Sequence, residues 1–206
     1  MGEGTLTALR DIRVLQEGME MGKWTAVELV HDYLEQIAKY NHQVNAVLEV
    51  NPDAEFIAAI LDEERRLKGP RSLLHGIPIL LKDNIDTGDK LHTSAGSLAL
   101  KNSYAQTDAT IVKRLRAAGA VILGKTNMTE WANFMSDRMP SGYSSRGGQV
   151  QNPYGIEKFD VGGSSAGSGA AVASGFAPLA VGTETSGSIL NPASQNNIVG
   201  LSQRLA

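Results

Sequence analysis

The stretch of residues 160–192, DVGGSSAGSGAAVASGFAPLAVGTETSGSILNP, constrains the fold more than any other part of this chain. It holds two tight Gly/Ser turns, at residues 162–165 and 185–188, which are separated by an apolar run of small residues. Glycine lets backbone approach backbone or ligand without a Cβ in the way, at an entropic cost, so a cluster this dense needs a geometric reason. The run between the turns predicts a buried helix and a strand. Each turn presents a hydroxyl beside closely spaced N–H groups, so we expect the chemistry of the protein here.

Composition excludes several classes of protein. The 206 residues fit one domain, and a content of 42% hydrophobic and 20% charged residues is that of a globular protein. The net charge of −3 gives no sign of the basic surface that binds nucleic acid. The absence of cysteine excludes disulfides and thiolate chemistry, and the four histidines form no metal-binding pair. We therefore expect no metal, no other cofactor and no nucleic-acid partner.

The N-terminal residues lack the apolar core of a signal peptide, and no later run is long enough to span a bilayer. A cytoplasmic protein without a membrane partner is the default expectation.

Hydrophobic periodicity predicts alternating helices and strands along one domain. A helical pair is expected at about residues 5–41, with its first helix at 6–21 and its second opened by a capping box of Thr25 and Glu28. Further helices are predicted at 52–67, capped by Asn51, and at 108–118, capped by Asp108. Strands are predicted at 44–50, 76–82 and 120–123, and residues 136–153 read as a long loop. Apolar strands between helices indicate an α/β fold with a largely parallel sheet.

Residues 119–126, GAVILGKT, match the phosphate-loop pattern G-x-x-x-x-G-K-[ST]. That motif works because its intervening residues form a loop whose N–H groups wrap a phosphate. Here those residues are AVIL, which predicts a strand whose N–H groups are committed to a sheet. A nucleotide site at this position is therefore rejected.

Two serines and two lysines are the candidates for chemistry. No histidine lies near Ser164 or Ser188 in sequence and the G-x-S-x-G pattern is absent, so a serine nucleophile would need another base. A lysine can act as that base when burial lowers its pKa enough to leave it uncharged. Lys82, at the end of an apolar run, is the better placed candidate for this role. Lys125 also follows a strand, so spacing alone does not choose between them. Taken singly, each serine is more often a helix cap than a catalyst.

The second turn adds backbone donors to this set. Thr185, Ser186 and Gly187 would supply converging N–H groups, with that of Ser188, for an oxyanion hole.

Four motifs in one order make the chain resemble the amidase signature family, from roughly the Thr25 helix to residue 201. They are GIP with KDN at residues 76–78 and 82–84, GKTN at 124–127, GGSS at 162–165 and GTETSGS at 182–188. The resemblance implies an α/β/α core with a mixed sheet and hydrolysis of a small-molecule amide through an acyl-enzyme. It also implies a Ser-Ser-Lys triad, in which Ser188 is the nucleophile, Ser164 the bridging serine after a cis peptide bond, and Lys82 the base.

The sequence departs from that family at a few positions. Ser186 and Ala166 stand where glycine is common, and Leu190 stands where many members have arginine. The chain also ends shortly after residues 200–201, where the family usually continues, so we expect a truncated domain with an incomplete sheet. An open sheet edge favours a homo-oligomer that covers it. Two alternatives to an amidase remain: a catalytically silent binding or assembly module, and, less favoured, an anion- or nucleotide-binding domain.

Overall fold

The computed structural model describes residues 11–202. Six α-helices and six strands are found in this range, with two short 3₁₀ helices. In chain order they are α1 Ile12–Glu20, α2 Ala26–Val44, β1 Val47–Val50, α3 Ala54–Lys68, β2 Pro78–Lys82, η1 Leu98–Leu100, α4 Thr110–Ala117, β3 Val121–Thr126, η2 Glu130–Asn133, β4 Tyr143–Ser144, β5 Gly148–Gln149, α5 Ala166–Ala173, β6 Leu179–Val181 and α6 Leu190–Gln195.

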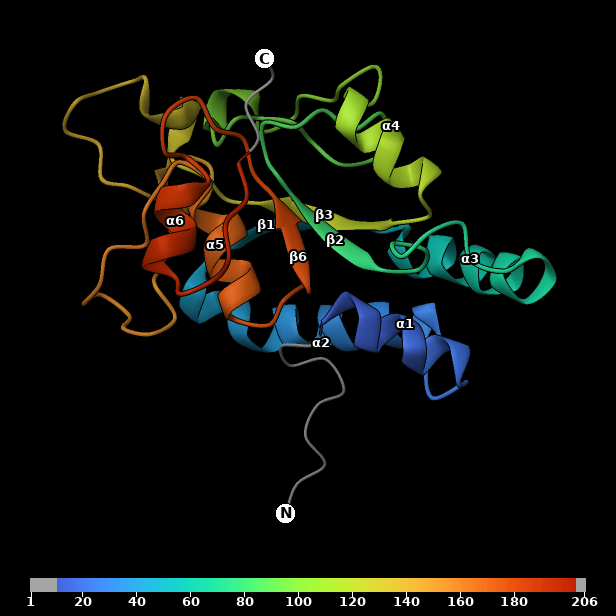
Figure 1. The fold of residues 1–206 in the computed structure, drawn as a ribbon. Helices are drawn as coiled ribbons and strands as arrows, with labels where there is room; N and C mark the ends of the chain where they lie inside the picture. Colours follow the sequence, from blue (N-terminus) through green and yellow to red (C-terminus); the bar gives the residue numbers. More distant parts are fainter. Residues whose placement is uncertain (1–10, 203–206) are drawn as a thin grey trace.

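A four-stranded mixed sheet in the order β1-β3-β2-β6 forms the centre of the fold. β2 lies parallel to β3 and β6, and β1 pairs antiparallel with β3. Every residue of β2 and β3 is buried, because helices cover both faces: α4 lies on one side of the sheet, and α1 and α2 lie on the other (Figure 1). The predicted α/β class with a mixed, mostly parallel sheet is confirmed.

The first two helices are well specified by the sequence. Thr25 and Glu28 form the predicted capping box at the start of α2. The helix predicted over residues 6–21 is present as α1, with Leu15 and Met19 in the core, and residues 6–10 lie outside the described range.

Two helices begin later than predicted, and distant partners bond the side chains expected to cap them. Asn51 donates through its backbone N–H and side-chain amide to the carbonyls of Leu123 and Ile122 on β3. Its Oδ1 still accepts from the Asp53 N–H at 3.0 Å, but α3 begins only at Ala54, with Asp53 as its N-cap. The carboxylate of Asp108 accepts hydrogen bonds from the Gly88 N–H and the Arg116 guanidinium. α4 therefore begins at Thr110 without a side-chain cap.

Two other boundaries also differ from the prediction. The strand expected from residue 44 begins at Val47, because α2 continues to Val44 and ends at Asn45 in a left-handed conformation. The loop expected at 136–153 contains a small antiparallel hairpin of β4 and β5. Short polar strands rich in Ser and Gly carry little alternation, so periodicity does not reveal this hairpin.

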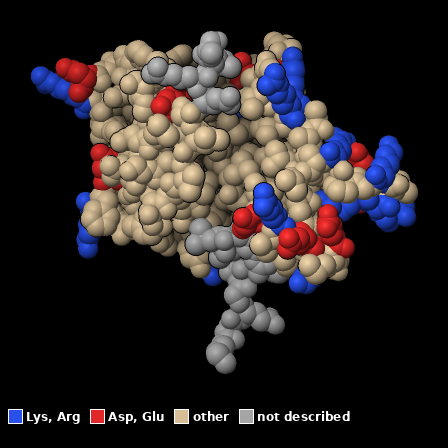
Figure 2. Space-filling view, viewed as in Figure 1, with Lys and Arg blue, Asp and Glu red and all other residues tan. Residues whose placement is uncertain are grey.

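Strand β6 forms one edge of the sheet and is only half-buried along its length. A groove of about 540 Å³ lies beside it, with walls from α5, α6 and residues 198–201. Charged side chains gather over α1, α3 and α4, whereas the surface over β6, α5 and α6 shows almost none (Figure 2). No helix between residues 11 and 202 has both the length and the apolar character needed to cross a membrane.

Candidate active site

Lys82 ends β2 with its ammonium group inside the protein and bonded to two hydroxyl groups. Its Nζ donates to Ser164 Oγ at 2.8 Å, to Thr183 Oγ1 at 2.9 Å and to the Thr183 carbonyl at 3.2 Å. Asn84, two residues further on, points to the same side and donates to Thr183 Oγ1 at 3.0 Å. The contact with Ser164 joins residues 82 positions apart in sequence.

The Lys82 side chain is fully buried. Burial disfavours the charged form and lowers its pKa from the ordinary 10.5 to about 7, and the Glu184 carboxylate opposes this shift. At neutral pH a substantial fraction of Lys82 is therefore an uncharged amine, which is the form that accepts a proton.

The first Gly/Ser turn brings Ser164 to this lysine. The Gly163–Ser164 peptide bond is cis. Ser165, the residue before α5, bonds through its N–H to the Ser188 carbonyl at 3.0 Å and through its hydroxyl to the Thr183 carbonyl at 3.2 Å. The two Gly/Ser turns are therefore tied together, and the Ser164 hydroxyl is used by Lys82 and not as a helix cap.

The second turn, residues 185–188, is held by Glu184. Its carboxylate accepts hydrogen bonds from the Ile189 N–H at 2.6 Å and the Leu190 N–H at 2.9 Å. Bonds from the backbones of Leu190, Ile189 and Gly187 keep the pKa of this carboxyl below its usual range. Within residues 11–202, the N–H groups of Thr185, Ser186 and Ser188 have no hydrogen-bond acceptor.

A pocket of about 120 Å³ gathers the predicted site residues. Ser164 and Ser188 both line it, together with Thr183, Thr185 and Ser186 from the second turn and Ala132 and Phe134 from the η2 segment. Ser188 is half-buried, and its hydroxyl makes no hydrogen bond to any other described residue. The structure thus brings Lys82, Ser164 and Ser188 to one place.

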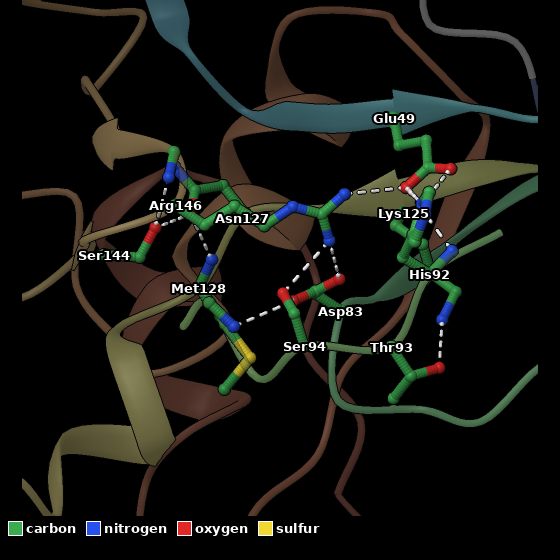
Figure 3. Close-up of polar contacts among 12 residues, drawn as sticks. Glu49, Asp83, His92, Thr93, Ser94, Lys125, Asn127, Met128, Ser144 and Arg146 are labelled. Carbon is green, nitrogen blue, oxygen red and sulfur yellow. Dashed lines mark hydrogen bonds and ion pairs between the residues drawn. The ribbon is translucent and has the colours of Figure 1, made fainter. Parts of the chain in front are cut away.

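Lys125, the second candidate base, belongs to a different buried network (Figure 3). Its Nζ donates to the Ile85 carbonyl at 2.7 Å and to Thr93 Oγ1 at 3.1 Å. Burial lowers its pKa to about 8, while Asp83 and three other carboxylates oppose the shift. Neither serine of the candidate triad lies among its hydrogen-bond partners.

Asp83 and Arg146 form the centre of this second network. The fully buried Asp83 carboxylate accepts from Ser94 Oγ at 2.5 Å, from the Gly96 N–H at 2.7 Å and from the Arg146 guanidinium at 3.1 Å. The same guanidinium reaches Glu49 Oε2 at 2.8 Å (Figure 3). Consecutive residues Lys82 and Asp83 therefore belong to separate networks, as expected where side chains alternate between the faces of a strand.

Sequence reasoning missed Thr183, Asn84 and Glu184. Thr183 and Glu184 stand in the recognised GTETSGS motif, and Asn84 shares the period-2 alternation of Lys82, so a signal for each was present. Residues 121–126 form strand β3 and Lys125 is committed to Ile85 and Thr93, so the phosphate-loop pattern does not form a phosphate loop. Across residues 11–202 no cluster of three or more His, Asp or Glu side chains is placed to hold a metal ion.

Residues 28–202 match the Amidase family, and the chain belongs to that family. It is 50% identical over 195 residues to a probable amidase of Arabidopsis thaliana, covering 94% of this chain and 37% of that protein. Over 187 residues it is 47% identical to a putative amidase of Schizosaccharomyces pombe, and the match covers 91% of this chain and 32% of that protein. The native peptide amidase of Stenotrophomonas maltophilia superimposes with a TM-score of 0.90 at 49% identity, covering 93% of this chain and 39% of that one. The chain thus spans about a third of the length of each relative.

Proposed function

We propose that this chain carries the catalytic residues of an amide hydrolase that works through a Ser-Ser-Lys triad and an acyl-enzyme. The observation that carries the proposal is the 2.8 Å hydrogen bond between the buried Lys82 Nζ and Ser164 Oγ, beside a pocket that Ser188 also lines. The pKa of about 7 for Lys82 supports its role as the base. The family supports the reaction class.

In the proposed first half-reaction, neutral Lys82 takes the Ser164 proton while Ser164 takes the proton of Ser188. The Ser188 oxygen bonds to the amide carbonyl carbon, and the carbonyl oxygen becomes an oxyanion. Because Ser188 makes no hydrogen bond to Ser164 in the free chain, its hydroxyl must turn toward Ser164 when substrate binds, and catalytic hydrogen bonds often tighten at that stage.

The backbone of residues 185–188 is proposed to hold this oxyanion. Thr185, Ser186 and Ser188 have N–H groups without an acceptor inside the described chain, whereas the Gly187 N–H donates to the Glu184 carboxylate. Donors fixed in advance toward a developing negative charge stabilise it without reorganising.

The tetrahedral intermediate then collapses, its oxyanion becomes a carbonyl again and the carbon–nitrogen bond breaks, which completes the first half-reaction. The leaving amine takes the proton returned from Lys82 through Ser164, and Ser188 keeps the acyl group. Water then attacks the ester, gives a proton to the same relay and releases the carboxylic acid, which restores Ser188. The proposed substrate is a small-molecule amide, and no step uses a cofactor.

A fluorophosphonate probe tests the proposal, because it labels serines that are activated as nucleophiles. We expect labelling at Ser188, mapped by peptide mass spectrometry, and its loss in Ser188→Ala. Circular dichroism and cooperative urea unfolding must show that each protein is folded. A folded wild-type chain that takes no label would overturn the proposed activity.

A second candidate function, a silent binding or assembly module, is favoured by the uncharged groove beside β6. Val199 and Leu201 line this groove and are exposed by 97 and 85%, next to a strand paired on one side only. Exposed apolar surface beside an unpaired strand is a typical pairing site, so a homo-oligomer that covers it stays a prediction. Sedimentation velocity tests it: a concentration-dependent dimer that Val199→Glu abolishes supports assembly, and a monomer at all concentrations contradicts it.

A further inference from the structure

A second pocket adjoins the one that holds the candidate triad. It encloses about 290 Å³ and shares the wall residue Ala132 with the smaller pocket. We call it the Trp131 pocket. The rest of its lining consists of Asn84, Thr93, Ser94, Ala95, Leu100, Met128 and Trp131.

One hydrogen bond links the two pockets directly. Asn84, which lines the Trp131 pocket, donates to Thr183 Oγ1 at 3.0 Å, and Thr183 lines the catalytic pocket and accepts from Lys82 Nζ. A group held in the Trp131 pocket therefore lies one residue away from the partner of the proposed base.

The wall of the Trp131 pocket is made of strained backbone. Trp131, Ala132 and Asn133 have φ values of 49°, 55° and 73°, and Ala95 on the facing wall has 50°. The Trp131 N–H donates to the Ala95 carbonyl at 2.9 Å, so the two strained segments support each other. Non-glycine residues in this left-handed region are unfavourable and cluster at ligand sites, because the surrounding structure must enforce them.

The buried network of Figure 3 supports this wall from behind. Lys125 donates to Thr93 Oγ1 at 3.1 Å, and Asp83 accepts hydrogen bonds from Ser94 Oγ and the Gly96 N–H. Thr93 and Ser94 line the pocket, so the charged network fixes the pocket wall even though it does not touch the triad. Such support keeps a binding pocket formed in the absence of a ligand.

We propose that the Trp131 pocket binds an apolar acyl side chain of the amide substrate, such as a branched alkyl or aryl group. The apolar surfaces of Leu100, Met128 and Trp131 face this space, while Asn84, Thr93 and Ser94 give it a few fixed polar groups. Mostly apolar pockets with few polar groups are typical of small-molecule subsites. The proposal rests on the proposed function and names the substrate class of that same site.

The test compares two phosphonofluoridate probes that differ only in the group on phosphorus, methyl or benzyl. Second-order rate constants for labelling Ser188 are measured in the wild type and in Leu100→Trp, which fills the pocket. Leu98→Trp is the matched control, because Leu98 lies on the same 3₁₀ helix, is 52% exposed and does not line the pocket.

We expect the benzyl probe to react at least about tenfold faster than the methyl probe with the wild type, since even one methylene in a fitting apolar pocket changes specificity by about 10–200-fold. Leu100→Trp should remove this preference, whereas Leu98→Trp should leave both rates, and therefore the preference, unchanged. Where the probes label Ser188, the proposal is overturned if the benzyl preference is absent, or if it survives in Leu100→Trp.

A binding measurement separates this proposal from the proposed activity. In Ser188→Ala, saturation-transfer difference NMR should show binding of phenylacetamide that is lost when Leu100→Trp is added and kept when Leu98→Trp is added. If neither probe labels the folded wild type but this binding pattern holds, the activity fails and the pocket stands. If phenylacetamide gives no signal, the pocket proposal fails.

Discussion

Lys82 and Lys125 lie at the ends of adjacent parallel strands, and both are fully buried, yet their surroundings differ. Lys82 faces the hydroxyls of Ser164 and Thr183, and one carboxylate, that of Glu184, raises its pKa. Lys125 faces a carbonyl and one hydroxyl within reach of four carboxylates. Burial lowers both pKa values, to about 7 and about 8. Equal burial thus lowers the pKa of Lys82 further than that of Lys125, where more carboxylates oppose the shift.

The largest expected effect separates the two lysines by reactivity. Lys82→Met should slow fluorophosphonate labelling of Ser188 by about a thousandfold, within the range lost when a general base is removed. Lys125→Met should keep most of the labelling, because Lys125 makes no contact with either serine. Rates are measured by gel fluorescence on variants that unfold cooperatively. Equal losses in both variants would contradict the assigned roles.

The next effect is on stability and concerns the network around Lys125. Asp83→Asn removes a buried charge that faces Arg146 and should lower the free energy of unfolding by about 3–5 kcal/mol, as when one partner of a buried ion pair is lost. The control Glu63→Gln breaks an exposed pair with Arg66, which solvent screens, and should change the free energy of unfolding far less. Urea denaturation measures both changes. A loss at Asp83 no greater than that at Glu63 would show that the network does not hold this part of the fold.

The pH dependence of stability distinguishes the lysines further. Unfolded lysine keeps its proton up to a pKa of 10.5, whereas folded Lys82 loses it near 7. Between these values the unfolded chain binds more protons, so this group makes stability rise with pH. Lys82→Met should flatten the rise from about pH 7, and Lys125→Met should flatten it only from about pH 8. Urea midpoints measured from pH 6.5 to about 10 check this, and identical curves for the two variants would contradict it.

The smallest effect concerns the one carboxylate that acts on Lys82. Glu184 raises the pKa of Lys82, so Glu184→Gln should lower it further and move the rise of labelling rate with pH to lower pH. The wild-type rate should rise through about pH 7 as Lys82 loses its proton. An unchanged or upward-shifted profile in the variant would mean that another group controls the reaction.

The sequence predicted the main helices and strands around the central sheet, the mixed sheet and the motifs that meet at the site, but not the β4–β5 hairpin or α6. It could not choose between Lys82 and Lys125 by spacing, because both follow apolar strands, and the contact that distinguishes them joins residues 82 positions apart. The helices expected from residues 52 and 108 begin at Ala54 and Thr110, where the side chains of Asn51 and Asp108 bond distant partners. Local patterns thus predicted local structure. Errors arose where contacts between distant residues determine the start of a helix or the partner of a side chain.

The alternation at the end of β2 has a consequence for how this protein can change. Lys82 points to the serines and Asp83 to the buried network, so deleting one residue from Pro78–Lys82 would exchange their directions at once. Such a deletion would bring the Asp83 carboxylate into the place of Lys82 beside Ser164, and Asn84 into the place of Asp83 opposite Arg146. Each place would then lose the charged group that bonds there. We therefore expect a conservative substitution within this strand to disturb the site less than any change in the length of the strand. The number of residues between the GIP and KDN motifs determines which side chain faces Ser164 and which faces Arg146.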